Sequence, residues 1–278
     1  MSQLVEKVSQ DIIAALESDQ LVLPTLPEVA LRVREVAEDP DASISQMGKV
    51  IGSDAALTAR LIKVANSPLL RGSREINDLQ MALARLGIEY ICNIATGLAM
   101  SQMFQATSDL VDKRLREVWN RSSEIAGICH VMCKHRTKLR PDQATLAGLV
   151  HRIGVLPILT YAEENPSLLR DSFTLDTVIE ALNGPIGDRI LKHWAFPDPL
   201  IHIPSQHVQF DRVAPEADYA DIVTVAVLQS YMGSNHPLAS VDYSTVTAFA
   251  RLGLDSDMEN AEGDDLSAEM EAAMAMLQ

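Results

Sequence analysis

Residues 115–133 read LREVWNRSSEIAGICHVMC, and this stretch decides the fold class. Its apolar and small side chains return every three or four residues, which places them along one face of an α-helix. Strand-like alternation of apolar and polar residues is absent from it. The stretch therefore predicts a long helix with one buried face, which is made of Leu115, Val118, Trp119, Ser122, Ile125, Ala126, Cys129 and Cys133.

Downstream of this stretch the sequence continues with helix signals. The basic run Lys134–Arg140 suits a helix C-terminus, where cations interact favourably with the helix dipole. Pro141-Asp142 then restarts a helix, because proline is tolerated in a first turn. Apolar spacing predicts later helices over Leu175–Leu182, Ile186–Trp194, Ala220–Met232 and Val241–Leu252.

Upstream, short helices with polar caps are expected. Thr25-Leu26-Pro27-Glu28 has capping-box spacing with the proline inside the first turn, and Ser43–Gln46 has the same spacing. Asp54 is expected to cap a third helix, and Gly87 to stop a fourth. A fifth is expected over Ile88–Phe104. With no convincing strand anywhere, the sequence predicts an all-α protein.

Composition limits the classes of partner. The net charge of -15 repels nucleic acid and anionic membranes, and no apolar run is long enough to span a bilayer. The first twenty residues carry Glu6, Asp11 and Glu17, so they do not resemble a signal peptide. Three cysteines fit a reducing compartment. We therefore expect a cytoplasmic protein that binds neither nucleic acid nor membrane.

The polar stretch 105–113 divides the chain, and the tail differs from the rest. We expect an N-terminal helix over 1–20, helical subdomains over 21–108 and 109–235, and C-terminal helices with an acidic tail over 236–278. Eight carboxylates and no basic residue follow Arg251. The tail is expected to be an acidic linker and a short amphipathic helix, outside the main fold, because its like charges repel one another.

Several segments together resemble the bacterial HDOD (HD-related output domain) family. The opening LPTLPEV, residues 23–29, is similar to the LPxLP motif of that family, and the matches at 54–61, 65–67 and 82–87 follow in the family's order. The segment AGLVHRIG, residues 147–154, stands where the family has AGLLHDIG. A later match covers residues 186–197. The resemblance spans roughly residues 21–230 and implies a multi-helix HD-like domain with an N-terminal helical subdomain.

The resemblance also implies a divalent metal site for hydrolysing phosphate esters, but this sequence departs from its ligands. His151-Arg152 replaces the His-Asp pair, so a cation stands where a metal-bridging carboxylate is expected. Only His151 and His207 keep a ligand side chain. We therefore expect a degenerate site with no metal, no other cofactor and no catalytic residue; the positions with non-ligand side chains are Arg121, Arg152, Asn183, Gln206 and Val227.

Four local features allow more than one interpretation. His151 is either a surviving ligand or a hydrogen-bonded structural residue, and the latter is favoured. A zinc site from Cys129, His130, Cys133 and His135 is disfavoured, because both cysteines lie on the apolar face. The basic run from Lys134 to Arg140 is either a nucleotide or phosphate site or a solvated helix end, and the helix end is favoured. Arg121 and Arg152 either form an anion pocket or pair with carboxylates such as Glu124, and pairing is favoured.

These observations favour a non-enzymatic module for signal output that acts through protein–protein contacts. The family resemblance implies partners among signalling proteins such as histidine kinases, response regulators or cyclic-di-GMP enzymes. Two alternatives stay open: an atypical metal-dependent phosphohydrolase of nucleotides or cyclic dinucleotides, and a nucleotide-sensing pseudoenzyme.

Overall fold

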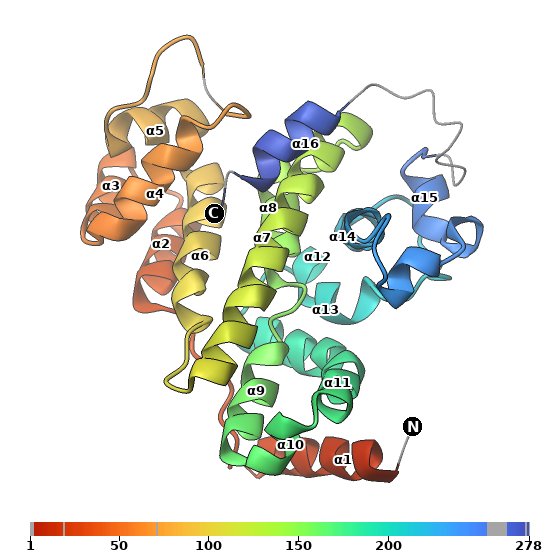
Figure 1. Ribbon diagram of the computed structural model, residues 1–278. Helices are drawn as coiled ribbons and strands as arrows, with labels where there is room; N and C mark the ends of the chain where they lie inside the picture. The colour runs from red at the N-terminus through yellow and green to blue at the C-terminus, as the bar shows by residue number, and fades with distance from the viewer. Residues whose placement is uncertain (1–2, 19, 71, 255–265, 276, 278) are drawn as a thin grey trace.

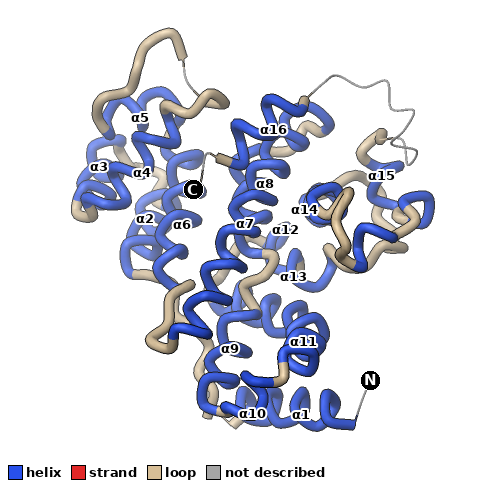
Figure 2. Tube along the Cα trace, viewed as in Figure 1, coloured by secondary structure: helices blue, strands red, loops and turns tan. Residues whose placement is uncertain are grey.

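The computed structural model describes residues 3–18, 20–70, 72–254, 266–275 and 277. Those residues form helices joined by turns and loops, with no strand among them (Figure 2). The all-α prediction is confirmed. The acidic linker expected over 255–265 lies outside the described residues.

The long helix α7 (Asp109–Arg136) runs through the middle of the molecule (Figure 1). It buries the predicted face, except that Val118 and Trp119 are half-buried. Helix α8 (Pro141–Val150) returns along it, and a Cβ on Gly148 would lie 2.5 Å from the Cα of Ala126. The glycine therefore lets the two backbones touch, and this close pair anchors both halves of the chain.

Five helices on one side of this pair form the N-terminal part: α2 (Glu28–Glu38), α3 (Ile44–Gly52), α4 (Ala55–Ala65), α5 (Leu79–Leu86) and α6 (Ile88–Met100). The predicted capping box at Ser43, the Asp54 cap and the stop at Gly87 are all present. Gly87 has φ 86°, a backbone conformation that favours glycine. Helix α6 packs on α8 and joins this part to the centre.

The remaining helices lie on the other side and at one end of α7. They are α1 (Gln3–Glu17), α9 (Val155–Glu164), α10 (Pro166–Arg170), α11 (Ser172–His193), α12 (Asp198–Ile201), α13 (Ile203–Gln206), α14 (Tyr219–Ser230) and α15 (Thr247–Arg251). Helix α1 packs against α11. Buried apolar side chains form two clusters, one mostly from α2–α6 and one mostly from the rest. The boundaries at 20/21, 108/109 and 235/236 stay predictions.

Three local predictions are wrong. Helix α2 begins at Glu28 with Pro27 as its N-cap and no side-chain cap, so the box at Thr25 is absent. Helix α11 continues through Pro185 instead of breaking. The two residues on each side of the proline, 183–184 and 186–187, are buried, and their packing offsets the cost of a proline inside a helix. Only Thr247–Arg251 of the expected helix over Val241–Leu252 is α-helical. A 3₁₀ turn, Tyr243–Thr245, precedes it, and the side chain of its N-cap Asp242 accepts from the Ser244 N–H.

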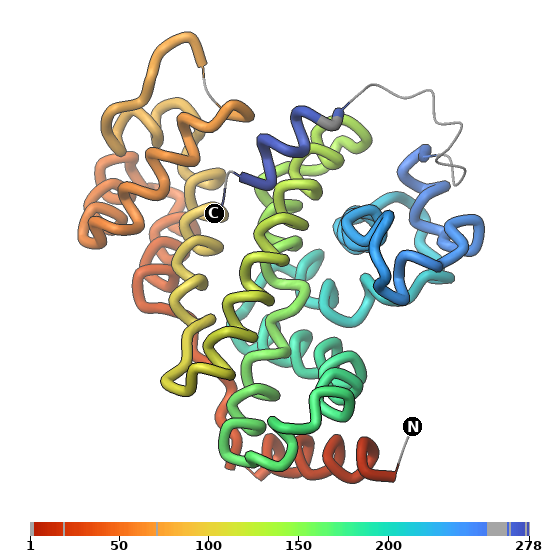
Figure 3. The backbone as a smooth tube through the Cα atoms, in the orientation of Figure 1, coloured from red at the N-terminus to blue at the C-terminus, as the bar shows by residue number. Residues whose placement is uncertain are grey.

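The tail helix α16 (Ser267–Met274) lies alongside α7, as the colours of Figure 3 show. Ala273 and Leu277 are buried there. The expected short helix is present, but it packs on α7 and does not stand apart from the fold. Its Glu269 contacts the basic end of α7, so the repulsion within the tail is offset by attraction to this run.

One helical stretch of the described chain, Pro141–Glu164, is long and apolar enough to cross a membrane by length and composition, contrary to the sequence-based expectation. However, 83% of its most apolar window is buried inside the fold. Such a stretch is typical of the core of a folded domain, and it covers α8 and α9.

Candidate functional site

The two histidines of the expected metal site lie together in the interior. The rings of His151, at the end of α8, and His207, after α13, meet edge to face with centroids 5.1 Å apart. His151 Nδ1 lies 2.6 Å from the carbonyl oxygen of Gly148, and His207 Nδ1 lies 2.9 Å from that of Ile203. Because a carbonyl only accepts, each Nδ1 carries the proton, and Nε2 of a neutral ring is then unprotonated.

Both rings are held neutral by their surroundings. Burial lowers the pKa of His207 to about 4. Burial, followed by the neighbouring His207 ring, lowers the pKa of His151 well below its ordinary value, and the charges of Arg152 and Arg121 act in the same direction. The pair therefore consists of two neutral imidazoles at physiological pH.

Asn183 on α11 completes the buried polar group. Its Nδ2 donates to the carbonyl oxygen of His151 at 2.9 Å, whereas its Oδ1 is buried without a hydrogen-bond partner. A buried, unpaired amide oxygen is costly. Gly154 allows this approach of α11, since a Cβ there would lie 2.2 Å from the backbone oxygen of Asn183. The three side chains thus come from three separate segments that the fold brings together.

Arg152 turns from this group toward α11. Its Nη2 lies 2.7 Å from Oε1 of Glu180. The side chain of Glu180 is largely exposed; partial desolvation would raise its pKa, but the charge and hydrogen bond of Arg152 outweigh this and lower the pKa. Arg152 and Glu180 therefore form an ion pair, with Arg152 next to His151 in the chain.

Arg121 on α7 is bound on several sides. It donates to the carbonyl oxygen of Ser230 at 2.7 Å and lies 3.3 Å from Glu124, the carboxylate expected as its partner. Its guanidinium carbon stands 4.2 Å from the centroid of the Tyr231 ring, close enough for a cation–π interaction. Its Nε is buried without a partner. These contacts tie α7 to the C-terminal end of α14.

The last two expected positions contribute no ligand. Val227 is buried in the main apolar cluster one turn before Ser230, and its side chain has no donor atom. Gln206 ends α13 and is half-buried. The geometry of the structure therefore brings His151, His207 and Asn183 together, with Arg152 and Arg121 close enough to act on His151 by charge.

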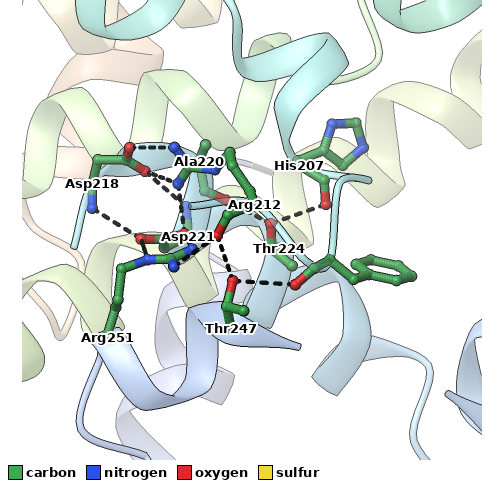
Figure 4. A network of polar contacts seen from close by, with 9 residues as sticks. His207, Arg212, Asp218, Ala220, Asp221, Thr224, Thr247 and Arg251 are labelled. Carbon is green, nitrogen blue, oxygen red and sulfur yellow. Dashed lines mark hydrogen bonds and ion pairs between the residues drawn. The ribbon is translucent and has the colours of Figure 1, made fainter. Parts of the chain in front are cut away.

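An ion cluster on α14 holds the segment that carries His207 (Figure 4). Asp221 is buried and accepts from Arg212 at 2.6 Å and from Arg251 at 2.7 Å and 2.8 Å. Burial would raise the pKa of Asp221, but the bonds and charges of Arg251 and Arg212 outweigh it and hold the pKa below its usual value. Arg212 also forms a two-bond pair with Asp218.

The cluster reaches the histidine through the backbone. Thr224 Oγ1 lies 2.9 Å from the carbonyl oxygen of His207, and Thr247 Oγ1 donates to the carbonyl oxygen of Arg212 at 2.7 Å (Figure 4). Both ends of residues 207–212 are therefore fixed to α14 and α15. The sequence did not indicate this cluster or the Glu180 partner, because Arg251 and Asp221 lie 30 positions apart and Arg152 and Glu180 lie 28 apart, and the nearer pair of Arg212 with Asp221 carries no motif.

The HDOD domain family matches residues 23–210, well over half of the chain. This protein is a member of the HDOD family. A candidate metal-dependent phosphohydrolase from Shewanella amazonensis SB2B is 31% identical, has a TM-score of 0.86 and is matched over 99% of both chains.

Two further proteins are similar to this HDOD protein at lower sequence identity. A candidate signal transduction protein from Marinobacter aquaeolei VT8 is 20% identical with a TM-score of 0.66, over 98% of this chain and 65% of that one, which shows the shared fold alone. An uncharacterised protein from Treponema pallidum (strain Nichols) is 25% identical over 73% of this chain. The chain spans only 41% of the length of that curated relative.

The donor atoms of this HDOD site do not fit the divalent metal that the HD resemblance implies. Hard cations need converging carboxylate and imidazole ligands. The site offers two imidazoles and the unpaired amide oxygen of Asn183, beside the positive charges of Arg121 and Arg152. No group of three or more His, Cys, Asp or Glu side chains able to hold a metal occurs in the described parts of the chain.

The other features weighed from the sequence take part in packing and pairing. Cys129 and Cys133 are fully buried, as predicted, and burial raises the pKa of both thiols. His130 Nδ1 lies 2.9 Å from Thr145 Oγ1 instead of joining the cysteines. In the basic run, Lys134 and His135 pair with Glu269, and Arg140 pairs with Glu89 and Asp142.

Proposed function

We propose that this HDOD protein is a non-enzymatic module of bacterial signal transduction that acts by binding other proteins. The observation that carries the proposal is the ion pair of Arg152 with Glu180, 2.7 Å apart, where the HD resemblance places a metal-bridging aspartate. The charge of Arg152 lowers the pKa of both His151 and His207, and the same charge opposes a cation bound beside these two rings. On this proposal the metal site is degenerate and the fold serves as a scaffold.

The remaining polar contacts support a structural role for the old site. Each histidine donates Nδ1–H to a backbone carbonyl, and Asn183 spans from α11 to His151. Val227 packs in the apolar core where the resemblance expects an aspartate. These contacts hold α8, α11 and α13 together. His151, His207 and Asn183 therefore have a structural role that does not require catalysis.

We infer the partners from those that the HDOD resemblance implies. The proposed partners are signalling proteins, among them histidine kinases, response regulators and cyclic-di-GMP enzymes, and the net charge of -15 disfavours nucleic acid and anionic membranes. One solved relative carries a signal-transduction name, which supports this choice only at the level of the fold. Three unpaired, buried cysteines fit the reducing cytoplasm, where we place the protein.

An atypical phosphohydrolase is the second candidate, because the Shewanella relative at 31% identity carries a metal-dependent phosphohydrolase name. A nucleotide-sensing pseudoenzyme is the third, and it would use Arg121 and Arg152 as an anion site. Both guanidinium groups are already bound, one to Ser230 and Glu124 and the other to Glu180. An anion would have to displace those partners, so this candidate is less favoured.

The proposal is tested by metal binding. Purified wild-type protein and the Arg152→Asp variant are each titrated with Mn²⁺ by calorimetry and analysed for bound iron and manganese. We expect no stoichiometric metal in either, because Arg152→Asp removes one opposing charge but leaves Arg121 and Val227 in place. Stoichiometric metal in the wild-type protein would contradict the proposal.

A further inference from the structure

The tail helix α16 lies antiparallel to α7 with a defined register. Glu269 contacts Lys134 Nζ at 2.5 Å and His135 Nε2 at 2.8 Å, near the C-terminal end of α7. One turn further along the tail, Ala273 lies over Gly127, and then Leu277 lines a pocket of about 420 Å³ with Trp119. As the contacts advance along the tail from Glu269 to Leu277, they move back along α7 from Lys134 to Trp119, which is about four turns of α7.

Gly127 makes this close contact possible. A Cβ at Gly127 would lie 2.5 Å from the carbonyl carbon and oxygen of Ala273 and 2.6 Å from the nitrogen of Met274. These are backbone atoms, so they cannot rotate away. Glycine in the interior of a long helix is unfavourable, and a packing reason is expected for it. The surface of α7 is therefore shaped to receive another helix with a small residue at its centre.

Charge fixes the direction of the bound helix. Lys134 and His135 stand in the last turn of α7, and Glu269 stands in the first turn of α16. Each charge then also complements the dipole of its own helix. The hydrogen bond from Lys134 is the main cause that lowers the pKa of Glu269, so this carboxylate is ionised at physiological pH. An antiparallel acidic helix therefore fits this surface better than a parallel one.

The hold on α16 is limited. The helix has eight residues, and isolated helices of that length are marginal in water. Among its described side chains only Ala273 is fully buried, and Leu277 is buried just beyond its end. The segment also lies outside the family match at 23–210. An eight-residue helix held by an ion cluster, the buried Ala273 and Leu277 and the half-buried Met270 and Met274 is short enough to exchange.

We propose that the surface of α7 from Lys134 and His135 through Gly127 to Trp119, here the α7 groove, docks an acidic helix of a partner protein, and that α16 is the occupant which this partner displaces. The partner helix carries Glu or Asp, then a small residue four positions later and a large aliphatic residue eight positions later. Glu269, Ala273 and Leu277 show this pattern. The choice of a signalling protein as partner rests on the proposed function.

The test uses the full chain and a labelled synthetic peptide with the sequence of residues 265–278 as the probe. The Glu269→Lys variant weakens the chain's own helix and leaves the groove unchanged. Because the attached α16 competes at a high effective concentration, the wild-type chain should bind the peptide weakly. We expect Glu269→Lys to bind it roughly tenfold more tightly or better in fluorescence anisotropy. A peptide carrying the same Glu269→Lys change is the matched control and should not bind.

Blocking the groove should abolish the gain. Gly127→Leu, added to Glu269→Lys, places a side chain where the peptide backbone must lie. Lys134→Gln, at an exposed position, removes the charge that the acidic peptide contacts without attracting the lysine that Glu269→Lys places in the chain's own tail, and serves if the leucine variant does not fold. Equal peptide binding with and without these blocks would overturn the proposal, as would no gain in Glu269→Lys. A dimer of the wild-type chain that exchanges α16, seen by sedimentation, would overturn the partner and assign a second copy.

The result of the peptide-binding assay and the result of the metal-binding test do not depend on each other. A failed peptide assay leaves the metal-binding test of Arg152 untouched. Metal bound by the wild-type protein would contradict the non-enzymatic proposal even if the groove exchanges helices.

Discussion

The rings of His151 and His207 meet edge to face at 88°, although 56 positions separate them in the chain. Each ring donates its Nδ1 proton to the backbone, and each is buried. The fold therefore keeps two neutral imidazoles side by side, because burial lowers the pKa of both rings most and the charge of Arg152 lowers it further. This arrangement has a measurable consequence for stability.

Acidification from pH 6.5 to about 4 should destabilise the protein through these rings. The pKa of His207 falls from 6.5 in the unfolded chain to about 4 in the fold. Its contribution to stability is full above pH 6.5 and is lost as pH falls through 4, by roughly 3 kcal/mol. His207→Gln should flatten the dependence of the free energy of unfolding on pH in this range, measured by urea denaturation. The exposed His193→Gln is the control and should keep the wild-type slope.

Asp221 should be among the most sensitive positions in the C-terminal half. Asp221→Asn leaves Arg212 and Arg251 without the carboxylate that both share. Breaking such a buried pair costs about 3 kcal/mol in the free energy of unfolding. Urea denaturation measures it, and Asp176→Asn, at an exposed pair with Arg114, should cost less than about 1 kcal/mol. Equal losses would show that the α14 cluster is not a structural anchor.

The tail helix should contribute to stability, contrary to the sequence-based expectation. Leu277→Ala removes a buried side chain next to Trp119 and should lower the free energy of unfolding by about 2 kcal/mol. The exposed Leu110→Ala is a comparison that should change it little. An unchanged melting temperature in Leu277→Ala would restore the view of the tail as a separate segment.

Cys129 and Cys133 should resist thiol reagents in the native state. Both side chains are fully buried, and burial raises the pKa of each thiol, so little thiolate is present. Labelling should be slow in buffer and complete in denaturant. A Phe173→Cys variant, at a position that is 80% exposed, provides a thiol that should react at once. Rapid native labelling of the two buried cysteines would contradict the packing of α7.

Periodicity and caps predicted most of the helices, because each helix buries one face and its start depends on nearby residues. The Ser43 box and the Asp54 cap are of this local kind. Features that depend on distant residues were missed. The break expected before Ile186 was wrong, since packing on both sides of Pro185 outweighs one lost hydrogen bond.

The candidate site was predictable only in part. Ordered motifs identified the positions of His151 and His207 and the cation at Arg152. The partner of Arg152 is 28 positions away, and nothing near it in the sequence indicates Glu180. The tail was misjudged for a similar reason, because its own charges were counted without those of Lys134 and His135 on α7.

The most direct test of the central claim is turnover. The purified protein is assayed with Mg²⁺, Mn²⁺ and Fe²⁺ against mononucleotides, cyclic dinucleotides and a generic phosphodiester, beside His151→Ala and Arg152→Asp variants. The account predicts no metal-dependent hydrolysis by any of the three proteins, because lowering the pKa of a bound water needs a metal that this donor set does not hold. Metal-dependent turnover by the wild-type protein that is lost in His151→Ala would contradict it.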